Sequence, residues 1–179
     1  MHLVVMGVLV SMTVSAASPL VELSVGDPLP ALRGEFLTGR TAVLPQDATG
    51  RVALLMFGFT YESRFQVETW AKRFRQDFSA EPRVTFFEIP MIGGLARMGK
   101  WFIDSGMRRG TPKPDYGNVI TVYGGTDAWK KRVAFREPNA AYLILLGQDG
   151  RVRWRYTGSL DEKPYQALSS EVSRLLARE

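Results

Sequence analysis

The stretch Val52–Phe59, with the sequence VALLMFGF, is apolar at nearly every position and has the length of a β-strand. A strand with one solvent-facing side would alternate apolar and polar residues, so a continuous apolar run predicts a strand buried on both faces. Such strands lie in the middle of sheets that are covered on both sides. We therefore expect Val52–Phe59 to be the central strand of the fold.

The residues that follow have the period of an amphipathic helix. Thr60 can cap the helix N-terminus, and Glu62 places a negative charge in its first turn. Apolar side chains then recur at helical spacing, at Phe65, Trp70, Phe74 and Phe78. A second apolar run, Val84–Ile92, predicts another buried strand. Strand, helix and strand in this order predict a parallel crossover.

The rest of the chain continues the alternation. Residues 94–109 carry apolar side chains at helical spacing, at Leu95, Met98, Phe102 and Ile103. Residues 118–123 are typical of a short strand, and a brief helix starts at Thr126-Asp127. Asp149-Gly150 between the strand-like runs 142–146 and 152–156 predicts an antiparallel hairpin. The order of elements predicts an α/β domain.

A final helix follows, and its pattern is the clearest of all. Asp161 can cap it. Its apolar residues recur on one face, at Tyr165, Leu168, Val172, Leu175 and Leu176.

Segments at both ends of the chain resemble a known superfamily. Val25–Pro30, followed by Gly39-Arg40, Leu44 and Gly50-Arg51, is similar to the opening of peroxiredoxins and periplasmic thioredoxin-like proteins. Ile144–Gly158 is similar to their closing hairpin. The resemblance implies a thioredoxin-like fold, a central mixed β-sheet flanked by helices, as a single domain over residues 18–179.

The position of the thioredoxin active site departs from this superfamily. The resemblance places Glu62 and Phe65 where thioredoxins have two thiols, and Ser63 where peroxiredoxins have the peroxidatic cysteine. Ala141 stands in place of the cis-proline. The chain contains no cysteine, so disulfide exchange and peroxide reduction, which both need a thiolate, are excluded. Its one histidine, His2, precedes the domain, so the domain has no imidazole for a triad or a zinc site.

Thioredoxin folds bind extended polypeptide between the N-terminus of the first helix and the loop before the closing hairpin. The resemblance therefore implies a partner-binding site made of Thr60, Tyr61, Glu62, Ser63, Arg64, Asn139, Ala141 and Tyr142. For Glu62 and Ser63 the plain alternative is helix capping, because acidic and hydroxyl side chains are ordinary in a first turn.

Two basic segments are further candidates for contact with a partner. Arg151, Arg153 and Arg155 alternate with apolar residues, which predicts a basic docking stripe on one face of a strand or, alternatively, a solvated sheet face. Trp101, Phe102 and Met107 lie near Arg108, Arg109 and Lys113, a pattern that fits a membrane-facing or client-facing surface. We nevertheless expect at least half of these apolar side chains to pack in the core.

Gly94–Lys100 has the spacing G-x-x-x-x-G-K of a phosphate-binding loop. Trp101 occupies the position where such a loop needs Ser or Thr to hold magnesium. We therefore interpret the segment as a helix opened by glycine, with Lys100 extending to the surface, and expect no nucleotide or other cofactor.

The N-terminus indicates export. Met1–Ala17 has no Asp, Glu, Lys or Arg and ends in small residues, so it resembles a signal peptide cleaved after Ala16 or Ala17. Its first residues lack the usual Lys or Arg, and an uncleaved anchor is the alternative. We expect a periplasmic or secreted protein, which would not meet nucleic acid.

The C-terminal half also resembles the mitochondrial ATP synthase assembly factor family, in Trp101–Arg108, Val122-Tyr123 and Tyr142–Trp154. That resemblance implies a chaperone for a subunit of a membrane complex. Together these features predict a non-redox, non-catalytic chaperone or assembly factor with a protein client, with peripheral membrane contact as a further prediction. The alternatives are a small-ligand or lipid-binding module and a non-thiol enzyme that uses Glu62 with Ser63 or Lys100.

Overall fold

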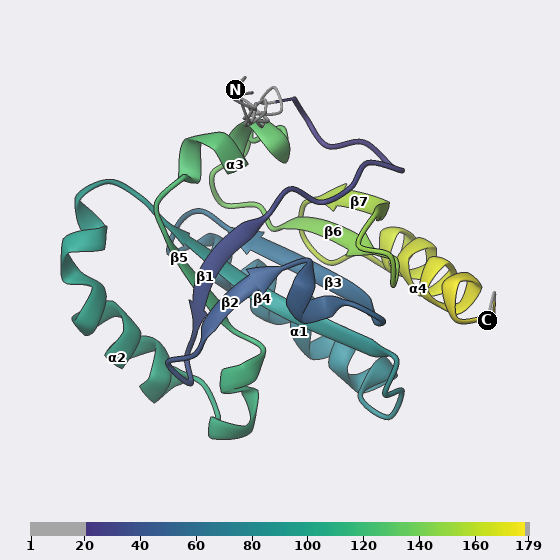
Figure 1. Ribbon diagram of the computed structural model, residues 1–179, viewed down its shortest axis with the longest axis horizontal. Coiled ribbons are helices and arrows are strands. Elements are labelled where there is room, and N and C mark those ends of the chain that lie inside the picture. The colour runs from purple at the N-terminus through teal and green to yellow at the C-terminus, as the bar shows by residue number, and fades with distance from the viewer. Residues whose placement is uncertain (1–20, 178–179) are drawn as a thin grey trace, which may run out of the picture.

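A computed structural model describes residues 21–177, so the predicted signal peptide at residues 1–17 lies outside the described part (Figure 1). The described chain forms one mixed sheet in the order β2-β1-β5-β4-β3-β6-β7. The strands are β1 (Leu32–Phe36), β2 (Thr41–Leu44), β3 (Val52–Gly58), β4 (Val84–Ile92), β5 (Ile120–Tyr123), β6 (Tyr142–Leu146) and β7 (Val152–Thr157). The helices are α1 (Ser63–Phe78), α2 (Lys100–Gly110), α3 (Thr126–Arg132) and α4 (Glu162–Leu176), with short 3-10 turns η1 (Gln46–Ala48), η2 (Gly94–Gly99) and η3 (Lys113–Gly117).

Strand β3 is the centre of this sheet, as its apolar run predicts. It pairs in parallel with β4 and antiparallel with β6, and all seven of its residues are buried. Ala53, Leu55 and Phe57 face one hydrophobic core, whereas Val52, Leu54 and Met56 face a second. A continuous apolar sequence results because both faces of the strand are covered.

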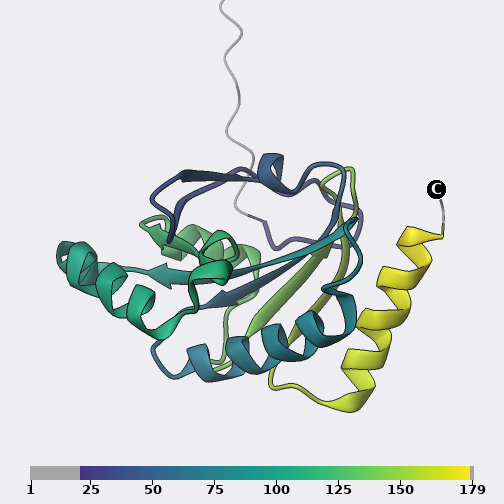
Figure 2. The same ribbon diagram turned by 90° about the horizontal axis from the view of Figure 1, so that it is seen from below.

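The two cores define the layers of the molecule. Helices α1 and α4 cover one face of the sheet (Figure 2), where Trp70, Phe74 and Leu168 are fully buried. On the other face, the β1–β2 hairpin at one end of the sheet bends back over β3, and together with helix α3 it covers that core (Figure 2). Leu32 of the hairpin and Trp129 of α3 belong to this core. Helix α2 supplies no side chain to either core and lies at one side of the molecule, next to β1 and β5 (Figures 1 and 2).

Most of the predicted elements are confirmed. β3 and β4 form the parallel pair, β6 and β7 form the antiparallel hairpin around Asp149-Gly150, and the α/β class is correct. Asp161 caps α4 by accepting a hydrogen bond from the Lys163 N–H at 3.1 Å.

Three features differ from the sequence predictions. The hairpin β1–β2 was not predicted, because its short strands lack a clear apolar alternation. Phe65 does not join the core stripe of α1, which consists of Val67, Trp70, Ala71 and Phe74, and is 52% exposed. The helix predicted over 94–109 starts as the 3-10 turn η2 and becomes α-helical only at Lys100.

Gly34 allows β1 to approach β5 closely. A Cβ at position 34 would lie 2.6 Å from Ile120 Cγ2 and 2.8 Å from the Thr121 carbonyl oxygen, and that backbone oxygen cannot move without shifting β5. We expect Gly34→Ala to lower the free energy of unfolding by about 1–3 kcal/mol, measured by urea denaturation. The matched control is Gly117→Ala, where a Cβ meets nothing within 4 Å, and which should raise stability by about 0.4–1 kcal/mol. Equal effects at the two positions would contradict the close approach.

Candidate functional site

The turn between β3 and α1 is closed by two hydroxyl side chains. The Thr60 N–H donates to Ser63 Oγ at 3.1 Å, the Ser63 N–H donates to Thr60 Oγ1 at 3.1 Å, and Ser63 Oγ donates to the Thr60 carbonyl at 2.8 Å. These reciprocal bonds satisfy backbone groups at the start of the helix, as a capping box does. Thr60 therefore caps α1 as predicted, although regular helix begins three residues later, at Ser63.

An exposed group of side chains lies on this turn, and we call Tyr61, Arg64 and Phe65 the aromatic cluster. The Tyr61 and Phe65 rings meet edge to face with centroids 5.9 Å apart, and they are 66% and 52% exposed. The Arg64 guanidinium lies 5.0 Å from the Tyr61 ring centre and 5.1 Å from that of Phe65, and it pairs with Glu68 at 3.0 Å. The cluster is thus held in one arrangement although it faces solvent.

The structure brings the turn beside the loop that precedes β6, as the sequence predicts. Thr60 Oγ1 lies 3.1 Å from the Pro138 carbonyl oxygen and 3.2 Å from Asn139 Oδ1, across 78 and 79 residues of sequence. On the next turn of α1, Gln66 Oε1 accepts a hydrogen bond from the Ala141 N–H at 3.2 Å. Thr60, Tyr61, Glu62, Arg64 and Asn139 therefore share one end of the sheet.

Three of the predicted contact residues are buried and cannot touch a partner. Ser63 and Ala141 are fully buried, and Tyr142 is 1% exposed. The Tyr142 hydroxyl accepts hydrogen bonds from the Arg136 and Glu137 N–H groups at 2.9 and 2.8 Å and donates to the Glu137 carbonyl at 3.0 Å. The prediction is corrected accordingly, because these residues shape the turn and loop from beneath.

The basic stripe of β7 is also corrected. A β-bulge at Leu145/Leu146 breaks the alternation, so Val152 faces one core while Trp154 faces the other. The guanidinium groups are engaged separately: Arg151 with the Gly26 carbonyl at 2.8 Å, Arg153 with Asp149 at 2.5 Å, and Arg155 with Glu22 at 3.1 Å. They bind the N-terminal segment and the hairpin turn, and they do not form a continuous free docking surface.

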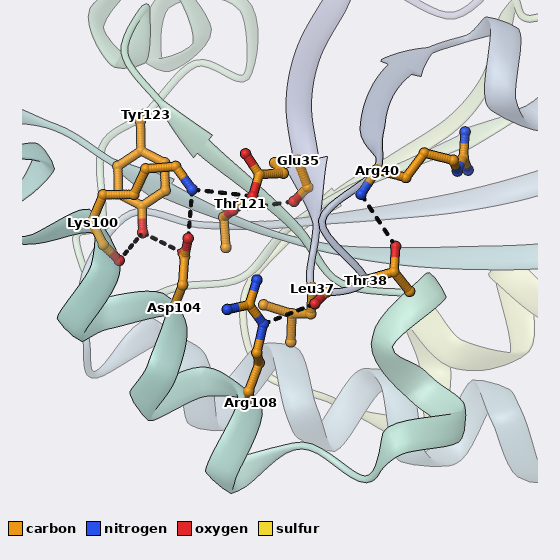
Figure 3. A network of polar contacts seen from close by, with 9 residues as sticks. All are labelled: Glu35, Leu37, Thr38, Arg40, Lys100, Asp104, Arg108, Thr121 and Tyr123. Carbon is orange, nitrogen blue, oxygen red and sulfur yellow. Dashed lines mark hydrogen bonds and ion pairs between the residues drawn. The ribbon is translucent and has the colours of Figure 1, made fainter.

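Helix α2 is attached to the sheet edge by its polar face (Figure 3). Asp104 is 4% exposed and accepts hydrogen bonds from Lys100 Nζ and the Tyr123 hydroxyl, both at 2.5 Å. Lys100 also pairs with Glu35 of β1 at 3.2 Å, and Arg108 donates to the Leu37 carbonyl at 2.9 Å. This polar network connects α2 to β1 and β5.

The apolar face of α2 consequently points outward. Met98, Trp101 and Phe102 are 82%, 80% and 69% exposed, so the prediction that at least half of the apolar residues here would join the core is wrong for Trp101 and Phe102. The sequence contained a signal for this orientation. Lys100, Asp104 and Arg108 recur every four residues and thus share one helix face.

The network also decides against a phosphate-binding role for Lys100. Its hydrogen bond to Asp104 raises the pKa of Lys100, and the contact with Glu35 adds to that shift, so the ammonium stays charged and engaged. Gly94–Gly99 forms a 3-10 turn rather than an open loop around an anion. We therefore retain the interpretation of this segment as a helix start, although Lys100 pairs with carboxylates instead of extending freely into solvent.

A groove of about 500 Å³ opens at the carboxyl ends of β4 and β5. It is lined by Gly93, Gly94, Gly124, Gly125, Met98 and the first residues of α3. Neither of the exposed aromatic residues Tyr61 and Trp101 lines it, so the groove is separate from both.

Within residues 21–177, no group of three or more His, Asp or Glu side chains is arranged to hold a metal ion. In the same range, no helix has both the length and the apolar character needed to cross a bilayer.

Comparison with known proteins shows the class of fold. No protein-family model matches the sequence, and no curated protein does either. A structure described as a thiol:disulfide interchange protein DsbE from Chlorobium tepidum covers 87% of this chain and 99% of its own, at 15% identity and a TM-score of 0.59. A disulfide isomerase structure from Bacteroides thetaiotaomicron covers 87% and 91%, at 13% identity and a TM-score of 0.60. BsSco, of the Sco family of cytochrome c oxidase assembly proteins, covers 86% and 98%, at 16% identity and a TM-score of 0.57.

The chain therefore has the thioredoxin-like fold that its two terminal segments predict, in a version without cysteine. Its candidate site lies at the end of β3 and the start of α1, where the sequence resemblance places the thiols of thioredoxins. These comparisons do not show the resemblance to the mitochondrial ATP synthase assembly factor family, and that part stays a prediction from sequence.

Removing the carboxylate of Asp104 should loosen α2 from the sheet. We expect Asp104→Ala to lower the free energy of unfolding by about 1–3 kcal/mol, because Tyr123 and Lys100 lose their shared acceptor. Hydrogen exchange should become faster over residues 100–110 and stay unchanged in β3. The control is Arg109→Ala, on the exposed side of the helix. Wild-type exchange rates over α2 in Asp104→Ala would contradict the attachment.

Glu88 gives the stability of the protein a defined pH dependence. Burial raises the pKa of this β4 carboxyl from 4.5 to about 7, and Glu68 adds to the shift, while Arg75, which pairs with Asp115 at 3.0 Å, opposes it. The folded state thus favours the protonated carboxyl. The stability of the fold with respect to Glu88 is therefore greatest below pH 4.5, where this carboxyl is protonated in both the folded and the unfolded chain. That stability is lost as the pH rises to about 7, the pKa in the folded state.

We expect Glu88→Gln to remove this dependence. Relative to the wild type, the variant should gain about 3 kcal/mol in unfolding free energy between pH 4.5 and pH 8, as measured by urea denaturation across that range. Parallel stability curves for the two proteins would contradict the assignment.

Proposed function

We propose that this chain is a non-redox binding protein that holds another polypeptide, as a chaperone or assembly factor for a protein of the cell envelope. One observation carries the proposal. At the position where thioredoxin-like proteins have reactive thiols, this chain presents the exposed aromatic cluster Tyr61, Arg64 and Phe65. Tyrosine and arginine are enriched among the residues that dominate binding energy at protein interfaces.

The surroundings of the cluster favour a polypeptide as the ligand. The adjoining loop supplies the exposed Asn139 side chain, which can both donate and accept hydrogen bonds with a peptide backbone. The aromatic rings supply apolar surface for side chains of the bound segment. Because Arg64 and the edge-to-face contact favour this arrangement of the rings before binding, they reduce the side-chain entropy that binding would cost.

Catalysis by the same residues fits the geometry less well. The Ser63 hydroxyl is fully buried and donates to the Thr60 carbonyl, so it is not available as a nucleophile. Lys100, the second proposed partner of Glu62, is engaged by Asp104 and Glu35. These contacts support a binding role over a non-thiol enzyme.

Two further observations support the proposed location and class of client. The signal-like segment Met1–Ala17 supports export. The similarity in fold to BsSco, which belongs to a family of cytochrome c oxidase assembly proteins, supports a role in assembly of an envelope protein.

Photo-crosslinking in intact cells tests the proposal on the full-length protein. A photoreactive residue at position 61 should capture one reproducible protein partner, whereas the same residue at the exposed position 72, farther along α1, should not. When Phe65→Ala is combined with the photoreactive residue at position 61, we expect capture to fall about tenfold, because interface aromatic residues contribute roughly 1–3 kcal/mol each.

The folded state of each variant is checked by thermal unfolding, which should be unchanged because Phe65 lies outside the core. Equal capture from positions 61 and 72, or undiminished capture from position 61 by a folded Phe65→Ala variant, would contradict the proposed site.

A further inference from the structure

Helix α2 carries its largest apolar side chains on its solvent side. Trp101 and Phe102 of α2, and Met98 in the turn η2 directly before it, are each more than two-thirds exposed, whereas a surface helix normally turns such residues to the core. The orientation is held in place by the polar contacts of the same helix, where Asp104 is buried with Lys100, Tyr123 and Glu35 around it. Turning the apolar side chains inward would require breaking this network, so the folded chain itself does not cover them.

The charge of the segment has one sign. Between residues 98 and 113 there are four cations and one carboxylate, and the carboxylate, Asp104, is buried and paired with Lys100. Arg109 and Lys113 are exposed, and within residues 21–177 neither takes part in an ion pair. Arg109 follows Phe102 by seven residues and therefore lies on the same helix face. The exposed side of α2 is thus apolar at its start and cationic at its end.

The place of α2 in the molecule narrows the choice of partner. It is an outer element at one side of the molecule in both views (Figures 1 and 2), and its side chains Trp101 and Phe102 are 80% and 69% exposed. A protein partner would need a matching groove, whereas the interfacial layer of a bilayer accepts a projecting helix without one. Tryptophan favours that layer, and arginine and lysine are attracted to anionic lipid headgroups.

We propose that the exposed face of α2 is a peripheral membrane-binding surface for anionic lipid. Met98, Trp101 and Phe102 enter the interfacial region, and Arg109 and Lys113 bind the phosphates of the headgroups. The surface is distinct from the aromatic cluster on α1, and the proposal stands independently of the function proposed for that cluster.

Vesicle binding by the full domain tests this surface. The protein should sediment with vesicles of phosphatidylcholine mixed with phosphatidylglycerol much more strongly than with phosphatidylcholine alone, and high salt should weaken that binding. We expect Trp101→Ala/Phe102→Ala to reduce the partition coefficient about tenfold or more. Arg109→Ala/Lys113→Ala should reduce it to a similar extent on anionic vesicles only, since each cation near such a surface contributes roughly a fivefold factor.

The matched control is Tyr61→Ala/Phe65→Ala, which removes two comparably exposed rings from α1 and should leave vesicle binding unchanged. A readout without substitution comes from lipids brominated in their acyl chains, which should quench the emission of Trp101 in the wild type. Of the other three tryptophans, Trp70 and Trp129 are buried and Trp154 is partly buried against a core, and Trp101→Phe identifies the quenched residue while keeping an apolar ring.

Three results would overturn the proposal. The folded wild type could bind neither kind of vesicle. Binding could be equally strong in the folded Trp101→Ala/Phe102→Ala variant, which would place it on another face. A photoreactive residue at position 102 could capture a protein partner while vesicles are not bound, which would assign α2 to a protein interface.

Discussion

The burial of β3 on both faces is the constraint on which the rest of the structure depends. Its seven residues supply alternate side chains to two cores, and each large apolar side chain buried this way contributes about 1.5–3 kcal/mol. Both faces of the strand must be covered, so α1 and α4 pack on one side and the β1–β2 hairpin with α3 on the other. The chain leaves β3 at Gly58 and enters the turn that presents the aromatic cluster, which is why that cluster stands at a fixed place on a rigid base.

A second and opposite arrangement governs α2. Burying the Asp104 carboxylate is costly, even with the partly exposed Lys100 beside it, and a well-packed apolar contact at the same place would often be equally stable or more so. The molecule instead keeps charges inside this junction and an aromatic face outside. This arrangement, with a carboxylate inside and aromatic side chains outside, is favourable if a partner such as an anionic bilayer covers the aromatic side chains.

The two exposed surfaces differ in chemistry and in shape. The aromatic cluster lies on a turn beside a polar loop and suits an extended polypeptide, whereas the α2 face is exposed, apolar and cationic and suits a lipid interface. Both proposed surfaces lie on a thioredoxin-like scaffold that contains no thiol. On this basis a protein that stays at a membrane surface while holding a second polypeptide is a consistent description of the molecule.

The sequence by itself determined the strands β3 and β4, the β6–β7 hairpin, the helices α1 and α4, and the loss of thiol chemistry, because apolar period, turn chemistry and residue inventory are local properties. It also placed Thr60 and Asn139 in one site through a resemblance to a known fold. Only the tertiary structure decided that Tyr142 is buried, that a bulge divides the arginines of β7, and that Trp101 and Phe102 face solvent. Each of these depends on contacts between residues far apart in the chain, such as Lys100 with Glu35, and helical spacing alone does not specify which face of a helix such contacts will bury.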